Sequence, residues 1–222
     1  MLNIYVLHYQ DDALTGRCVE SLLRDDWVFY NCNIYVVDNG SPEPIDWYFS
    51  GVEIIRHERN LHLIPALNEA MKRTRGYAYW CLNNDVRPAV GCAKVIYEAF
   101  NDGDMGIVAP GSSDMSTGIL YAAGPEPGVI LPAPHVDNHA WAFCDDVVQA
   151  IGWPDAEGHP HRANWYANRM YCWKARKAGY RVACVRGGWV EHDHKGGFDA
   201  VADYEGYKWI QARLGEQVEE AL

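Results

Sequence analysis

The sequence predicts an α/β protein with a mostly parallel central sheet flanked by helices, and a smaller mixed region in its second half. In the first half, short apolar runs rich in β-branched and aromatic residues alternate with segments of helical periodicity. Polar turns follow three of these runs. Because strands that alternate with helices form parallel sheets, ligands are expected beyond the carboxyl ends of the strands.

The first half is predicted to contain five strands and three helices. The strands are expected over residues 2–7, 33–37, 52–56, 77–82 and 105–109. The helices are expected over residues 13–23, 63–75 and 91–100. Leu14, Cys18 and Leu22 share one face of the first helix, and Gly76 is expected to close the second as a C-terminal cap.

The second half is less regular. Residues 110–140 are rich in Gly, Pro and Ser, with a short β run at 128–131, which indicates an irregular or hairpin segment over the sheet edge. Helices are expected over 145–151 and 164–178, the latter capped by Asn164 and ended by Gly179. Strands at 181–185 and 189–190, a polar turn at 191–197 and an amphipathic helix follow. We expect one domain over residues 1–222, with halves at 1–110 and 111–222.

Composition limits the possible partners. The formal net charge of −11 argues against binding to a nucleic-acid backbone, which needs a basic surface. A small anion held through a metal ion remains compatible with it. Seven cysteines without a C-x-x-C pair are expected to be reduced thiols of a cytoplasmic protein. No apolar window reaches transmembrane length, so any membrane association is expected to be peripheral.

The most informative segment is the apolar run at residues 80–82, which ends on Asn83, Asn84 and Asp85. Alternate side chains of a strand share a face, so Asn83 and Asp85 are expected to point the same way. A carboxylate there suits a hard cation such as Mg²⁺ or Mn²⁺. The alternative is an ordinary polar turn, in which Asn and Asp are common.

Two further polar turns are expected at the same edge of the sheet. His8 and Tyr9 follow the first strand, and Asp38 and Asn39 follow the second. Three turns that converge on the carboxyl edge of a parallel sheet indicate a ligand site better than any one of them.

Several motifs together resemble family 2 glycosyltransferases. The nucleotide-sugar half of that family is resembled by Val36-Val37-Asp38-Asn39-Gly40-Ser41, Asn60-Leu61 with Asn68, Arg75-Gly76-Tyr77 and Leu82-Asn83-Asn84-Asp85. Its acceptor half is resembled by residues 178–182 and 190–192. The resemblance implies a GT-A fold and transfer of a sugar from a nucleoside diphosphate sugar, UDP-linked or similar, with Mn²⁺ or Mg²⁺. Residues 1–110 then form the nucleotide-sugar half and residues 111–222 the acceptor half with the final helix.

The same resemblance implies roles for individual residues. Asp85 occupies the place of the last acid of the metal-binding Asp-x-Asp, and His192 resembles the late histidine that completes the metal shell, with His194 as the alternative. The expected donor-binding residues are His8, Tyr9, Asp38, Asn60, Asn68, Asn83, Asn84 and Asp85. Asp38 can instead form an Asx turn, Tyr9 can be a core residue, and Asn68 can serve only its own helix.

Two positions depart from the family pattern. The glycine expected after Asn60-Leu61 is His62, so the loop geometry there is open. The acidic pair that supplies the base in inverting members is replaced by Ala167-Asn168, neither of which can accept a proton. Asp155, then Glu157, is the expected substitute base. A retaining reaction, and loss of catalysis, stay open.

The acceptor is expected to lie over Trp141, Trp153 and Trp165, whose rings can stack on a sugar. A glycan, a lipid-linked glycan, a protein and a modified nucleobase are all compatible acceptors. A domain that only binds a nucleotide or glycan is the main rival function. A nucleotidyltransferase is disfavoured because Gln10-Asp11-Asp12 would repel a triphosphate. A zinc site in the 159–161 and 192–194 segments is a minor alternative, and solvated histidines are favoured there.

Overall fold

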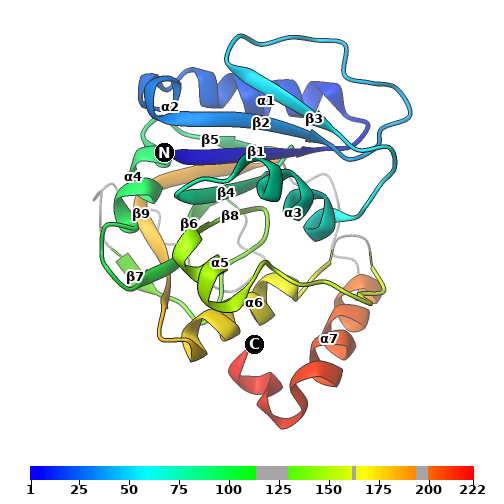
Figure 1. Cartoon of the computed structure of the whole chain (residues 1–222), viewed down its shortest axis with the longest axis vertical. Helices are drawn as coiled ribbons and strands as arrows, with labels where there is room; N and C mark the ends of the chain where they lie inside the picture. The colour runs from blue at the N-terminus through cyan, green and yellow to red at the C-terminus, as the bar shows by residue number, and fades with distance from the viewer. Residues whose placement is uncertain (114–129, 162–163, 194–199) are drawn as a thin grey trace.

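The computed structural model describes residues 1–113, 130–161, 164–193 and 200–222 (Figure 1). Within these residues nine strands form one sheet in the order β3-β2-β1-β4-β8-β6-β9-β5, with β7 paired to β9. The strands are β1 Leu2–His8, β2 Cys32–Asp38, β3 Val52–Arg56, β4 Ala78–Asn83, β5 Val86–Pro88, β6 Met105–Ser112, β7 Ile130–Pro132, β8 Ala140–Cys144 and β9 Arg181–His192. The helices are α1 Asp12–Leu23, α2 Asp26–Asn31, α3 Leu63–Thr74, α4 Cys92–Ala99, α5 Asp145–Ile151, α6 Ala167–Lys177 and α7 Ala200–Leu214, followed by the 3₁₀ helix η1 Gly215–Glu220.

The half of the sheet that carries β3, β2, β1 and β4 is entirely parallel. His8 pairs with Asp38, and Leu7 pairs with Asn83, so the carboxyl ends of β1, β2 and β4 are level with one another. The mostly parallel α/β prediction is therefore confirmed, and three predicted polar turns meet at one edge of the sheet.

The other half of the sheet is mixed, and sequence patterns missed part of it. β8 runs antiparallel between β4 and β6, and all five of its residues are buried, so no alternation of polar and apolar residues marks it as a strand. The other missed strand, β5, has only three residues and ends in Pro88 at the sheet edge, where a missing N–H is tolerated. The short helix α2, capped by Asp25, was also missed.

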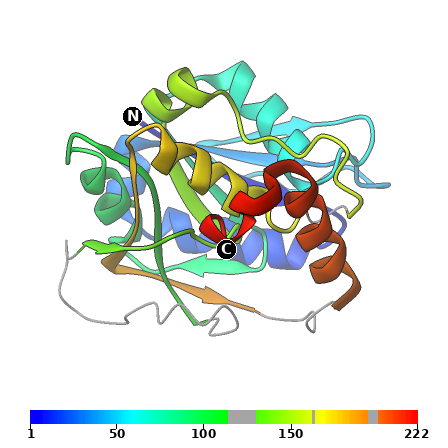
Figure 2. The ribbon, with the colours of Figure 1, turned by 90° about the horizontal axis from the view of Figure 1, so that it is seen from below.

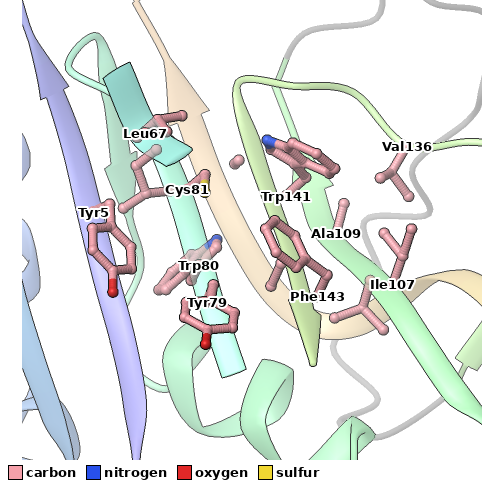
Figure 3. Close-up of a cluster of buried hydrophobic side chains, with 14 of the residues drawn as sticks. Tyr5, Leu67, Tyr79, Trp80, Cys81, Ile107, Ala109, Val136, Trp141 and Phe143 are labelled. Carbon is pink, nitrogen blue, oxygen red and sulfur yellow. The ribbon is translucent and has the colours of Figure 1, made fainter. Parts of the chain in front are cut away.

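Helices cover both faces of the sheet. Figure 2 shows α3 and α5 on one side and α1 on the other. The core between the sheet and α3 is rich in aromatic rings from β4 and β8, including Tyr79 and Phe143, whose ring centroids are 5.5 Å apart (Figure 3). This rigid centre holds the carboxyl ends of the strands in fixed relative positions.

Several predicted element boundaries differ in the structure. Gly76 does not adopt the left-handed cap conformation; a Cβ there would lie 2.7 Å from the Asn3 side chain, so close packing requires the glycine. The predicted strands at 181–185 and 189–190 are one strand, β9, with a register shift between them opposite Pro110 and Gly111.

Asn164 does not cap α6. That helix begins at Ala167 after Tyr166, whose φ is 72° and whose side chain makes no capping hydrogen bond. The Asn164 side chain instead accepts a hydrogen bond from the backbone N–H of Ile64 in the first turn of α3, at 3.0 Å. An N-terminal cap is therefore supplied from a residue 100 positions away, which joins the two halves of the chain.

Candidate functional site

A pocket of about 230 Å³ lies at the carboxyl ends of β1, β2 and β4. Its lining joins all three of the predicted polar turns with the residues that precede α3. The lining residues are Leu7, Tyr9, Asn39, Asn60, His62, Leu63, Asn83, Asn84 and Asp85. Five of the eight predicted donor-binding residues are in this set, and His8, Asp38 and Asn68 are not.

Asp38 is fully buried behind the pocket and has partners at both carboxylate oxygens. Oδ1 accepts a hydrogen bond from the Ser41 N–H at 2.9 Å, and Oδ2 lies 2.5 Å from Nη1 of Arg56. Arg56 also donates to the Ser41 carbonyl at 2.7 Å. In this structure the Asp38 carboxylate therefore fixes the turn after β2, through a hydrogen bond to the N–H three residues on and an ion pair with Arg56.

The turn after β2 packs directly on the loop before α3. Gly40 has φ of 73°, and a Cβ there would lie 2.2 Å from the Arg59 backbone, so only glycine fits. Beside it, the Asn39 side chain accepts a hydrogen bond from the Leu61 N–H at 2.8 Å and donates to Asn60 Oδ1 at 3.2 Å. Two loops that are remote in sequence are thus joined into one wall of the pocket.

Asp85 and His192 lie together because β5 pairs with β9. Val86 is opposite His192 in this antiparallel pair, and the Asp193 N–H donates to the Asp85 carbonyl at 2.7 Å. The His192 Nε2 atom lies 3.3 Å from Asp85 Oδ2, with side chains 9% and 27% exposed. The three-residue strand β5 therefore brings together two residues that are more than 100 positions apart in the sequence.

A second histidine supports His192 from behind. The ring of His139 stacks on that of His192, with centroids 4.6 Å apart and an interplanar angle of 8°. His139 Nε2 lies 3.0 Å from the hydroxyl oxygen of Ser112. No sequence pattern indicated this role, since the stacking depends on how the segment before β8 meets the end of β9.

The pair Asp85–His192 fits a divalent cation. The side chain of Asp85 offers a carboxylate and that of His192 an imidazole, both of which bind Mn²⁺. Asp85 Oδ1 is buried and has no hydrogen-bond partner among the described residues, as expected of an oxygen that serves a ligand. Across the described ranges no three His, Cys, Asp or Glu side chains form a metal cluster. His194 lies outside the described residues.

Of the other predicted donor residues, His8 and Asn68 face the protein. His8 is fully buried, its Nδ1 lies 2.7 Å from the Thr15 hydroxyl, and burial lowers its pKa. Asn68 donates to the Pro154 carbonyl at 2.7 Å, which fixes the segment around Pro154 to α3. Tyr9, by contrast, is 36% exposed and lines the pocket.

The two candidates for the acceptor base and the residue at the usual acidic position have different local partners. Asp155 Oδ1 accepts a hydrogen bond from the Glu157 N–H at 2.8 Å, and Glu157 is exposed. Asn168 is 5% exposed, and its amide donates to the Val136 carbonyl. The amide at the usual acidic position therefore links α6 to the segment that precedes β8.

The three tryptophans expected to bind an acceptor lie in different environments. Trp141 is fully buried, and its ring packs on that of Phe143 (Figure 3). It also packs edge-on against Tyr171, so no face is open to an acceptor. Trp153 is half-buried with its ring 5.2 Å from that of Tyr79. Trp165 is half-buried beside His161.

His159, considered for zinc, is held by the protein itself. Its two ring nitrogens lie 3.0 Å and 2.7 Å from the carbonyl oxygens of His161 and Trp165. At least one of these nitrogens must carry a proton to donate, and the buried ring thereby fixes the loop before α6.

Comparisons with solved structures identify the fold. The mannosyltransferase PcManGT from Pyrobaculum calidifontis, in complex with GDP-Man and Mn²⁺, matches with a TM-score of 0.66 and 15% identity over 99% of this chain and 62% of that one. GalNAc-T7 with UDP, GalNAc and Mn²⁺ matches with a TM-score of 0.67 and 13% identity over 86% and 43%. TarS 1–349 of S. aureus matches with a TM-score of 0.64 and 11% identity over 96% and 65%.

These likenesses and the strand order define a GT-A protein. The model of the family described as Glycosyl transferase family 2 matches residues 4–119, just over half of the sequence, and the chain belongs to that family. No curated protein matches the sequence. The chain spans less than two thirds of each of these three solved chains. No helix in the described part of the chain is long and apolar enough to cross a membrane.

Proposed function

We propose that the chain is a metal-dependent glycosyltransferase that moves a sugar from a nucleoside diphosphate sugar, such as a UDP-sugar, to an acceptor hydroxyl. The observation that carries this proposal is the pocket at the ends of β1, β2 and β4, with Asp85 and His192 beside each other at its edge. Membership of the family supports it. The solved neighbours named with GDP-Man or UDP and Mn²⁺ support the choice of ligand class.

In this proposal each residue of the pocket has a physical task. Tyr9 packs its exposed ring on the nucleobase, while Asn83 and Asn84 offer amide hydrogen bonds to the rest of the donor. Asp85 and His192 hold Mn²⁺ or Mg²⁺. A bound cation would neutralise the negative charge of the diphosphate when the bond between the sugar and the diphosphate breaks.

We further propose Asp155 as the acceptor base, with Glu157 as the second choice. Asn68, which donates a hydrogen bond to the Pro154 carbonyl, is five residues after Leu63 on α3. Leu63 lines the pocket. Five residues of α-helix span only about 7.5 Å. Trp153 and Trp165, which are half-buried, are the proposed aromatic contacts of an acceptor glycan, lipid-linked glycan or protein.

The expected location is the cytoplasm, including peripheral attachment to a membrane. Burial raises the pKa of the Cys18, Cys81 and Cys92 thiols, which keeps them protonated at neutral pH. Protonated core thiols suit a reducing compartment.

The test is donor binding and turnover measured on the same protein. Calorimetry with UDP and GDP, each with and without Mn²⁺, is expected to show binding that depends on the metal. Hydrolysis or transfer from a panel of UDP- and GDP-sugars should stop when EDTA is added and resume with excess Mn²⁺. Failure of every nucleotide to bind would refute the proposal.

A second candidate function is a domain that binds a nucleotide or glycan without catalysis. The favouring observation is Asn168, because the usual acid is replaced by an amide engaged with the Val136 carbonyl. Metal-dependent nucleotide binding with no turnover of any donor, together with unchanged binding in Asp155→Asn, would support this candidate. Turnover that Asp155→Asn reduces by at least about 100-fold would support the enzyme and its base.

A further inference from the structure

The loop before α3 contains a strained residue at the pocket wall. His62 has φ of 71° and ψ of 172°, a backbone region that is essentially restricted to glycine. The conformation is imposed by its neighbours: its N–H donates to Asn60 Oδ1 at 2.9 Å, and its carbonyl accepts from Asn39 Nδ2 at 3.3 Å and from the Ala66 N–H at 3.2 Å. A glycine would satisfy the same backbone hydrogen bonds without strain. The strain is therefore the cost of having a side chain at this position.

The His62 side chain lines the pocket and is half-buried. Within the described ranges its imidazole makes no hydrogen bond or ion pair. The neighbouring Ile64 N–H is already used by Asn164, so that backbone donor is not free for a ligand. The imidazole is therefore the group that can donate a hydrogen bond to a ligand where the loop meets α3.

The charge balance of the pocket indicates what His62 meets. Of the nine lining residues, His62 alone has a side chain that can carry a positive charge, and Asp85 alone carries a negative one. One divalent ion bound by Asp85 does not neutralise both the Asp85 carboxylate and the diphosphate of a nucleotide sugar. Release of the nucleoside diphosphate adds one more negative charge. A hydrogen-bond donor elsewhere in the pocket lining would stabilise that charge.

We propose that His62 donates a hydrogen bond from its imidazole to an oxygen of the nucleotide sugar's diphosphate, in the pocket that Asp85 also lines. This inference rests on the proposed function and assigns a contact in the same pocket. It also explains why a strained non-glycine residue is present: the side chain binds the donor at a cost in folding stability.

The experiment compares His62→Gly and His62→Ala with the wild type. The ligands are UDP, GDP, uridine and guanosine with Mn²⁺, measured by calorimetry, and the melting temperature of each protein is recorded without ligand. Both variants should weaken binding of the preferred nucleoside diphosphate about 10- to 100-fold, as expected for loss of one hydrogen bond to a charged group, and leave binding of its nucleoside unchanged.

Only His62→Gly should gain stability, because it removes the strain while His62→Ala keeps it. After the larger chain entropy of glycine is subtracted, a rise in melting temperature of about 2–4 °C is expected. His62→Ala shows whether the loss of affinity needs the imidazole rather than the backbone geometry.

The outcomes separate the two proposals. If the wild type binds a nucleoside diphosphate and both variants bind it equally well, the contact with His62 is refuted and the donor site stands. An equal loss for nucleoside and diphosphate would place His62 at the base or ribose, which also overturns the inference. If the wild type binds no nucleotide, the donor site and the inference fall together.

Discussion

Restoring the family's usual acid in Asn168→Asp should destabilise the protein rather than activate it. The wild-type amide is 5% exposed and donates its hydrogen bond to the Val136 carbonyl oxygen. A carboxylate cannot donate, so at neutral pH the variant would place a negative charge against that oxygen with little access to water. The position lies in the first turn of α6, where the helix dipole offsets part of this cost.

The magnitude follows from the expected shift in the pKa of the new carboxyl group. Burial should raise its pKa by about 2–3 units above the unfolded value of about 3.9, and each unit corresponds to about 1.36 kcal/mol. The free energy of unfolding should therefore fall by about 3–4 kcal/mol at pH 7.5. Because the folded pKa is raised, stability is retained below about pH 4, where the protonated group can donate to Val136, and is lost as pH rises toward 7.

The assay is urea denaturation followed by tryptophan fluorescence at pH 5 and pH 7.5, for the wild type, Asn168→Asp and the control Asn168→Leu. With a slope of about 2 kcal/mol per molar, Asn168→Asp should lower the midpoint by about 1.5–2 M at pH 7.5 and by less at pH 5. Asn168→Leu loses only the hydrogen bond, so its smaller cost of about 1–2 kcal/mol should not depend on pH. Wild-type stability of Asn168→Asp at pH 7.5, together with faster sugar transfer, would refute this reasoning.

Four further changes test the site and its support. Asp85→Asn keeps the size of a side chain that is 27% exposed, so the free energy of unfolding should change by less than about 1 kcal/mol. Mn²⁺-dependent nucleotide binding should fall at least about 10-fold in calorimetry, and retained metal dependence would contradict the assignment. Burial lowers the pKa of His135 to about 4, so the wild type should lose about 3 kcal/mol between pH 6.5 and pH 4, and His135→Phe should lose less in urea titrations across that range. Asn164→Ala removes the cap on the first turn of α3 and should cost about 1–2 kcal/mol in the same assay, with an unchanged midpoint counting against the link between the halves. Trp141→Ala should cost about 3–5 kcal/mol because the ring is fully buried, and a loss of acceptor binding at unchanged stability would restore its predicted surface role.

Local pattern was sufficient for much of the parallel half of the fold. The strands at Leu2–His8 and Val52–Arg56 and the helix at Leu63–Thr74 lie within one or two residues of their predicted ranges, because periodicity and turn residues act over a few neighbours. The same local logic placed Asn83 and Asp85 at the end of a buried strand, and parallel pairing brought that end level with those of β1 and β2.

The sequence by itself thus determined the α/β class, the edge of the sheet that carries the pocket, and the residue types available there. Tertiary structure decided which of those side chains line the pocket: Asp38 is paired with Arg56 behind it, and Trp141 lies in the core. It also decided that Asp85 lies beside His192, because that contact depends on a three-residue antiparallel strand with no periodicity of its own. Hydrogen bonding and packing between remote segments, which no short window of sequence contains, are the physical reason for the difference.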